Sequence, residues 1–210
     1  MKVLLYILYW IGQCTWGCIM TSIGLITVGI LWILGYKPHT FGPNIYVCVP
    51  GNWGGYNLGP VFIRGGQENG TPETDEYYAK HVPMHESGHG LQNLIFGPLF
   101  PLLVAIPSPW RCVLRKIENP KKMRDITVLV SSIAFCIGLF AAAAGMGFSI
   151  LGLIIGGLAF AAYACAFCIG FIIYEIPKYE NNKWTDYDEV WFEGQATEWG
   201  TKTYKHLFDK

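Results

Sequence analysis

The sequence predicts a membrane protein of the α+β class, with about three transmembrane helices and a small folded unit at the membrane face. Two uncharged, largely apolar runs cover residues 3–36 and 126–174. Only 14% of the 210 residues are charged and 52% are hydrophobic, whereas ordinary soluble domains carry about 25% charged residues. Short β-branched and aromatic segments lie between the two runs, and they provide the β part of the prediction.

The first run is longer than the roughly 20 residues that a helix needs to cross a bilayer. It contains no clear small-residue cleavage site, so residues 1–36 are predicted to form an N-terminal membrane helix that is retained. Gln13 and nearby aromatic residues indicate that the first part lies near a membrane interface. The deeper span is therefore expected at about 15–35. The aromatic residues are Tyr6, Tyr9, Trp10 and Trp16.

The second run, at 126–174, is long enough for two spans, so a transmembrane helical hairpin is predicted within 125–175. The preceding stretch 111–124 contains six basic residues and one acid, Glu118. By the positive-inside rule this stretch is cytoplasmic. The prediction is a multi-pass protein with the bilayer as a partner and its polar face in the cytoplasm. A net charge of zero gives no reason to expect nucleic acid.

The region 37–124 is predicted to hold the β structure and the chemically most informative helix. Residues 45–49 and 60–63 resemble strands, and the turn-forming stretch 50–55 separates them, which favours a β-hairpin or a two-stranded meander. Two strands alone are marginally stable in water, so the hairpin is expected to pack on a helix. The apolar segment 98–109 is interrupted by prolines and is predicted to dip into the membrane rather than cross it.

The strongest chemical signal is the motif His85-Glu86-Ser-Gly-His89. Positions i and i+4 lie on one face of a helix, so two imidazoles can converge on one zinc ion. Glu86 can accept a proton from a water whose pKa zinc has lowered. A chance arrangement on a surface helix is the alternative, but the chain has only five histidines. Gly88 within the motif indicates the close approach of another element.

The C-terminal region 176–210 is predicted to form an amphipathic helix over 185–204. At about 100° per residue, Glu193 shares a face with Ala196 and Gly200. A carboxylate followed by two small residues suits packing against the glycine-bearing motif helix, which would bring Glu193 to the metal as a third ligand. An acidic, solvated helix is the alternative. The Cys165-x-x-Cys168 pair lies in an apolar run and is interpreted as part of a membrane helix rather than a redox site.

The motif at 85–89, followed by Glu193-x-x-Ala196, resembles the gluzincin class of zinc metallopeptidases. Membrane members such as the CAAX-prenyl endopeptidases and the membrane heat-shock proteases share this arrangement. The run 85–99 is also similar to that of small bacterial membrane proteins. The resemblance implies that His85, His89 and Glu193 bind Zn²⁺, that Glu86 is the general base, and that the protein lies in a bacterial inner membrane. The chain departs from the prenyl-endopeptidase pattern at Thr197, where an outer-shell Asp is usual.

These features predict an integral-membrane zinc metallopeptidase that hydrolyses a peptide or a membrane-protein segment. Two alternatives stay open: a zinc hydrolase of a lipid or amide, and a catalytically silent membrane protein in which zinc joins two helices. A structural zinc has four protein ligands, whereas a catalytic zinc keeps one position for water. The mechanism also expects an oxyanion donor. The candidates are Tyr187, Tyr204, His81 and His206.

Overall fold

A computed structural model describes residues 2–51, 53–66, 77–114 and 187–208, with isolated positions between 126 and 157. The chain forms two compact units, Met1–Ala105 with Tyr187–Lys210, and Ile106–Asp186. The first unit contains every described strand and both helices of the predicted site. In the second unit, helix α5 spans Pro107–Leu114. Apart from isolated helical positions, the predicted hairpin within 125–175 lies outside the described residues, as do Cys165 and Cys168.

The apolar N-terminal run forms two helices, α1 (Lys2–Thr15) and α2 (Cys18–Ile33), which meet at an angle of 101°. The prediction of one helix over 1–36 is therefore corrected. The break occurs at Gly17, where an added Cβ would lie 2.5 Å from the side-chain amide of Asn93. Gln13, which was expected near a membrane interface, is instead fully buried in the protein.

Four strands form a mixed sheet in the order β1-β2-β4-β3. The strands are β1 (Pro38–Phe41), β2 (Asn44–Pro50), β3 (Gly55–Leu58) and β4 (Val61–Gly66). Strands β1 and β2 pair antiparallel, as do β3 and β4, while β2 and β4 pair in parallel.

The predicted hairpin of 45–49 with 60–63 is wrong, because these segments are parallel neighbours in β2 and β4. Strand β3 lies between β2 and β4 in the sequence and runs antiparallel to β4. The two actual hairpins turn at Gly42-Pro43 and at Gly59-Pro60, where the glycines have φ values of 58° and 80°. A positive φ at the first central residue is what a type II′ turn requires, so both turns depend on glycine.

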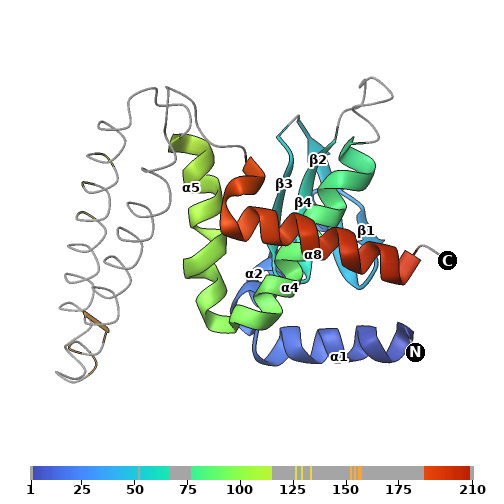
Figure 1. The fold of residues 1–210 in the computed structure, drawn as a ribbon, viewed down its shortest axis with the longest axis horizontal. Helices are drawn as coiled ribbons and strands as arrows, with labels where there is room; N and C mark the ends of the chain where they lie inside the picture. Colours follow the sequence, from blue (N-terminus) through green and yellow to red (C-terminus); the bar gives the residue numbers. More distant parts are fainter. Residues whose placement is uncertain are drawn as a thin grey trace. The chain divides into compact units, whose positions relative to one another are not determined.

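Helices cover both faces of this sheet (Figure 1). Val28 of α2 packs with Val47 and Val61 on one face. On the other face, Asn57 donates a hydrogen bond to helix α4 (Val82–Phe96). Helix α8 (Trp191–Phe208) crosses α4. A second core cluster of buried residues consists of Met20, Leu58, Phe100, Val104, Ala105, Val190 and Phe192.

Short helical turns flank the two site-bearing helices. The π-helical turn η1 (Tyr77–His81) precedes α4, and Pro83 lies in the first turn of α4, where a proline is well tolerated. After α4 follow a 3₁₀ turn, η2 (Gly97–Leu99), and a π-helical turn, η3 (Pro101–Ala105). The proline-rich segment is thus broken into short pieces, as predicted. A further 3₁₀ turn, η5 (Tyr187–Glu189), precedes α8, so the C-terminal helix begins later than the predicted 185.

Among the described residues, no single helix has both the length and the apolar composition to cross a membrane. Two pairs of consecutive helical segments reach this length and apolar composition when the two segments are taken together, but each pair is sharply bent. The pairs are α1 with α2, and Ala79–Leu99 with Pro101–Pro109, which meet at an angle of 117°. The predicted membrane spans and the membrane-dipping segment stay predictions.

Candidate metal centre

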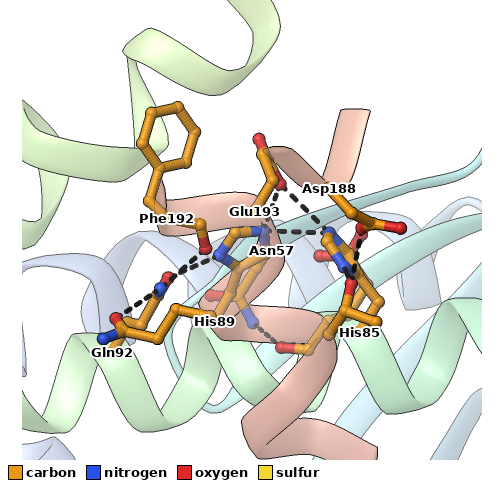
Figure 2. Close-up of polar contacts among 10 residues, drawn as sticks. Asn57, His85, His89, Gln92, Asp188, Phe192 and Glu193 are labelled. Carbon is orange, nitrogen blue, oxygen red and sulfur yellow. Dashed lines mark hydrogen bonds and ion pairs between the residues drawn. The ribbon is translucent and has the colours of Figure 1, made fainter. Parts of the chain in front are cut away.

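Helix α4 places His85 and His89 one turn apart with their imidazole rings nearly perpendicular. The ring centroids are 4.7 Å apart, and the two Nε2 atoms are separated by 3.1 Å. Pro83 at the start of α4 fixes the first turn, and Gly97, with a φ of 52°, ends the helix. Both Nε2 atoms point toward the same side of the helix, where α8 crosses (Figure 2).

Helix α8 brings the carboxylate of Glu193 to the same point. Its Oε2 atom lies 3.2 Å from the Nε2 atom of His85 and 3.1 Å from that of His89. The three atoms form a nearly equilateral triangle. Tetrahedral zinc with bonds of about 2.0–2.1 Å has its ligand atoms about 3.3 Å apart, so this triangle has the size that zinc requires. The structure thus brings together the three predicted ligands, across a separation of 104 residues between His89 and Glu193.

Small residues allow the two helices to cross this closely. A Cβ added at Gly88 would overlap the backbone carbonyl of Ala196, and one added at Gly200 would overlap the carbonyl of Met84. Ala196 itself is fully buried. The prediction that Ala196 and Gly200 pack against the glycine of the motif helix is confirmed. Any larger side chain at Gly88 would push α8 away and move Glu193 out of reach.

Hydrogen bonds hold each imidazole in the orientation that a metal ligand needs. The Nδ1 atom of His89 lies 2.7 Å from Gln92 Oε1. The amide nitrogen of Gln92 donates to the carbonyl of Phe192 at 2.7 Å, which fixes the direction of the amide. His89 Nδ1 therefore carries the proton, and its Nε2 presents a lone pair toward Glu193 in the neutral ring. Such an outer hydrogen bond fixes the tautomer of metal-binding histidines.

Glu86 is buried between α4 and the edge strand β3. Its Oε1 atom occupies the space that a side chain at position 55 would need, so a larger residue than Gly55 would displace the carboxyl group. Among the described residues, Glu86 Oε2 is buried without a hydrogen-bond partner. Burial raises the pKa of Glu86 above its ordinary value, although the nearby charges of His85 and His89 oppose the shift. A buried carboxyl with one free oxygen suits a group that accepts a proton during a reaction.

The charge balance at Glu193 favours a cation. Burial raises the pKa of Glu193, but the imidazoles of His85 and His89, when they also carry a proton on the nitrogen that faces the carboxylate, outweigh burial and hold this pKa below the ordinary value. Glu193 is therefore ionised although it is fully buried. Its other oxygen, Oε1, has no hydrogen-bond partner in the described part of the chain. A buried carboxylate next to two imidazole nitrogens is a donor set that zinc accepts, so these residues fit the predicted metal.

Sequence reasoning missed three residues that support the site. Gln92 lies three positions after His89, and this spacing makes the two residues neighbours on a helix. Asn57 donates to the backbone carbonyl of Glu86 at 2.7 Å and ties β3 to the motif helix. No local pattern reveals that contact, because the partner is 29 residues away. Gly55, the third, belongs to the turn-forming stretch 50–55, and that local pattern predicts a turn but not the contact with Glu86.

The predicted oxyanion donors stay untested. The side chain of His81 is exposed at the end of η1. The side chains of Tyr187, Tyr204 and His206 lie outside the described residues. No model of a known protein family, no curated protein and no solved structure matches this chain.

Proposed function

We propose that this protein is a membrane-embedded zinc metallopeptidase in which His85, His89 and Glu193 bind Zn²⁺. The observation that carries the proposal is the triangle of three donor atoms with sides of 3.1–3.2 Å, next to the buried carboxyl of Glu86. Zinc bound there supplies a Lewis acid that polarises a carbonyl and lowers the pKa of water.

Within the described part of the chain, three side chains contribute donor atoms to this cluster. A tetrahedral ion held by three protein ligands keeps one position for water or substrate, whereas a structural zinc has four protein ligands. This count favours an enzyme over a zinc that only joins α4 to α8. A fourth protein ligand would support the structural alternative.

Glu86 acts as the general base. Its raised pKa brings it closer to the range in which a carboxylate both takes and returns a proton near neutral pH. Glu86 takes a proton from the attacking water and passes it to the leaving amine nitrogen. The new C–O bond forms as Glu86 takes the proton, and the C–N bond of the peptide breaks afterwards, when the amine nitrogen receives that proton.

The substrate class is a peptide or a membrane-protein segment. Strand β3 is at the end of the strand order, and Gly55 within it lies against Glu86. An extended peptide can add to such an edge through main-chain hydrogen bonds, which would place its carbonyl groups near the metal. A zinc hydrolase of a lipid or amide would use the same metal and base but would not need the strand edge.

The surface of α1 and α2 supports the bilayer as a partner. Apolar side chains on these helices are exposed, and no charged residue occurs between Val3 and Tyr36. An apolar surface of this extent is typical of a membrane or protein contact. The most exposed members are Val3, Leu4, Ile26, Trp32, Ile33 and Leu34. We propose that acyl chains cover them and, from the basic stretch 111–124, that the metal centre faces the cytoplasm.

The full chain with zinc in nanodiscs, incubated with a library of quenched fluorescent peptides, tests the proposal. We expect cleavage by the native protein and a loss of about 10²–10⁴-fold in rate for Glu86→Gln. That variant should retain zinc, because Gln is nearly isosteric and Glu86 is not a ligand. Glu198→Gln, on the exposed side of α8, is the matched control and should cleave normally. Equal cleavage by Glu86→Gln would remove Glu86 from the base role.

A further inference from the structure

A chain of two hydrogen bonds leads away from His85. The Nδ1 atom of His85 lies 2.9 Å from the hydroxyl oxygen of Thr197, and that hydroxyl lies 2.9 Å from the Oδ1 atom of Asp188. Thr197 is on α8, one turn after Glu193, whereas Asp188 is on the 3₁₀ turn η5 that precedes α8. Figure 2 shows Asp188 beside His85, on the side opposite Gln92.

The directions of the two bonds follow from the protons available. A hydroxyl has one proton, and an ionised carboxylate can only accept, so Thr197 donates to Asp188. The lone pairs of the hydroxyl then face His85, which must carry its proton on Nδ1. The Nε2 atom of His85 is thereby left as a lone pair, aimed at the point where His89 and Glu193 also converge.

Close backbone packing fixes the position of Asp188 next to the first turn of α8. A Cβ added at Gly194 would overlap the backbone carbonyl of Asp188. The amide of Gly194 also donates to the carbonyl of Val190 at 2.9 Å. Only glycine at this position leaves room for η5 to fold back on the helix. The position of Asp188 thus follows from the same helix that delivers Glu193.

We propose that Thr197 and Asp188 form a positioning relay that connects the charge of a carboxylate to the zinc ligand His85. This inference rests on the proposed zinc site and adds two residues that act through His85 rather than on the substrate. A hydroxyl that accepts a hydrogen bond from a ligand imidazole, and donates its own proton to a carboxylate, makes the opposite nitrogen of the imidazole a better electron donor to the metal. His89 has the neutral amide of Gln92 in the equivalent place, so the two histidines differ in basicity.

The test is the zinc affinity of the full chain in detergent, measured by competition with a chromophoric chelator. Thr197→Val keeps the shape of the side chain without the hydroxyl, and we expect affinity to fall about 10–100-fold. Thr197→Ser keeps the hydroxyl and should bind as the native protein does. Asp188→Asn should weaken binding, and the double variant should be no weaker than Thr197→Val alone, because both changes break one chain of bonds.

Two controls distinguish a loss of the relay from a general change in charge or packing. Glu198→Gln removes a carboxylate from the exposed side of α8 and should leave the affinity unchanged. Thermal unfolding of the zinc-free forms should be equal for the native protein and Thr197→Ser. Thr197→Val should lose no more than the roughly 1–3 kcal/mol that its two hydrogen bonds account for, and a larger loss would indicate a packing defect.

Three results would overturn the relay alone: native affinity in Thr197→Val, equal losses in Thr197→Val and Thr197→Ser, or additive losses in the double variant. Absence of zinc from the native protein would overturn the metal centre itself and the relay with it. The two failures are therefore distinguishable in one set of measurements.

Discussion

The two sides of helix α4 are held in different ways. On the α8 side, contact is between backbones, because Gly88 faces the carbonyl of Ala196 without an intervening side chain. On the α1 side, contact is through polar side chains. Gln13 donates to the carbonyl of Gly90 at 2.7 Å and accepts from the side-chain amide of Asn93 at 2.6 Å, and the hydroxyl of Tyr9 fills the space next to Gly90.

This difference separates two tasks. Backbone contact leaves no side chain to rearrange, so the distance between α4 and α8, and with it the ligand triangle, is closely fixed. The α1 side has reversed polarity: buried Tyr9 and Gln13 face the protein, while apolar residues such as Leu4 and Leu8 face outward. Polar groups buried in this way attach the helix and leave its apolar face for another environment. In the proposed function, the α8 side would form the metal centre and the α1 side would be the membrane anchor.

The largest difference between the α8 side and the α1 side is expected when the metal is removed. Zinc that binds only the folded form at a thousand times its dissociation constant would stabilise it by about 4 kcal/mol. Removing zinc with a chelator, or replacing Glu193 by Gln, should abolish stoichiometric binding. Hydrogen exchange should then increase in α8 far more than in α1. Equal increases in both helices would show that the crossing does not depend on the metal, and retained zinc in Glu193→Gln would exclude Glu193 as a ligand.

The next effect compares two glycines two positions apart on α4. Gly88→Ala should destabilise the fold by about 3 kcal/mol, because the new methyl group meets the backbone of α8 and cannot be accommodated by a rotamer change. Gly90→Ala places its methyl group 2.5 Å from the hydroxyl of Tyr9 and 3.0 Å from the carbonyl of Gly59. The tyrosine can move, and alanine favours the helix by about 1 kcal/mol over glycine.

The net cost of Gly90→Ala should therefore be near about 1 kcal/mol. Chemical denaturation of the two variants beside the native protein measures the difference, with Gly29→Ala as the reference, since a Cβ there meets nothing within 4 Å. A cost at Gly90 equal to or above the cost at Gly88 would contradict the distinction between backbone and side-chain contact.

The crossing of α4 and α8 could be predicted from the sequence because its determinants are local. The i, i+4 spacing of His85 and His89, and the small residues Ala196 and Gly200 after Glu193, follow helical geometry alone. The motif helix presents a glycine, and the C-terminal helix presents a carboxylate followed by small residues, so the two helices are expected to pack against each other. Gln92 could have been found by the same rule, since it follows His89 by three residues.

The sheet order could not be predicted in the same way. Strand pairing between β2 and β4 depends on contacts across the whole unit, and the short segment Gly55–Leu58 has too few β-forming residues to be recognised as a strand. The two Gly-Pro turns at 42–43 and 59–60 are the local signal that was available. The burial of Gln13 could not be predicted either. A polar residue in an apolar run indicates a membrane interface, and its actual partners Gly90 and Asn93 are about 80 positions away in the sequence.

A moderate effect is expected on the α1 side from Gln13→Ala. The side chain accepts from Asn93 at 2.6 Å and donates to the carbonyl of Gly90. Truncation leaves these buried groups without their partner, at a cost of about 1–3 kcal/mol. Thr15→Ala on the same helix is the control, because within the described part of the chain the exposed hydroxyl of Thr15 bonds only to carbonyls of its own helix. Zinc affinity should change little in either variant, since α1 contacts the side of α4 away from α8.

Thiol labelling should have the smallest effect on the fold, and it tests most directly whether lipid covers α1 and α2. Cys14 on α1 and Cys18 on α2 are exposed free cysteines. If acyl chains cover this surface, a charged maleimide should not reach either thiol in nanodiscs, and unfolding in a chemical denaturant should make both reactive. A cysteine introduced at Lys202, whose side chain is 67% exposed on α8, should react in both conditions. Free reaction of Cys14 and Cys18 in nanodiscs would show that water, not lipid, covers this face.

The same reagent decides the side of the membrane on which the site lies. A predicted hairpin over 126–174 returns the chain to its starting side, so cysteines placed at Lys116 and Lys202 should share one side. Both should be protected in intact cells and labelled in inverted vesicles, because the basic stretch at 111–124 favours the cytoplasm. Labelling of one position from outside, but not the other, would mean an odd number of crossings between them. Glu193 could then not share a side of the membrane with the stretch that follows α4, and the two-helix prediction for 125–175 would fail.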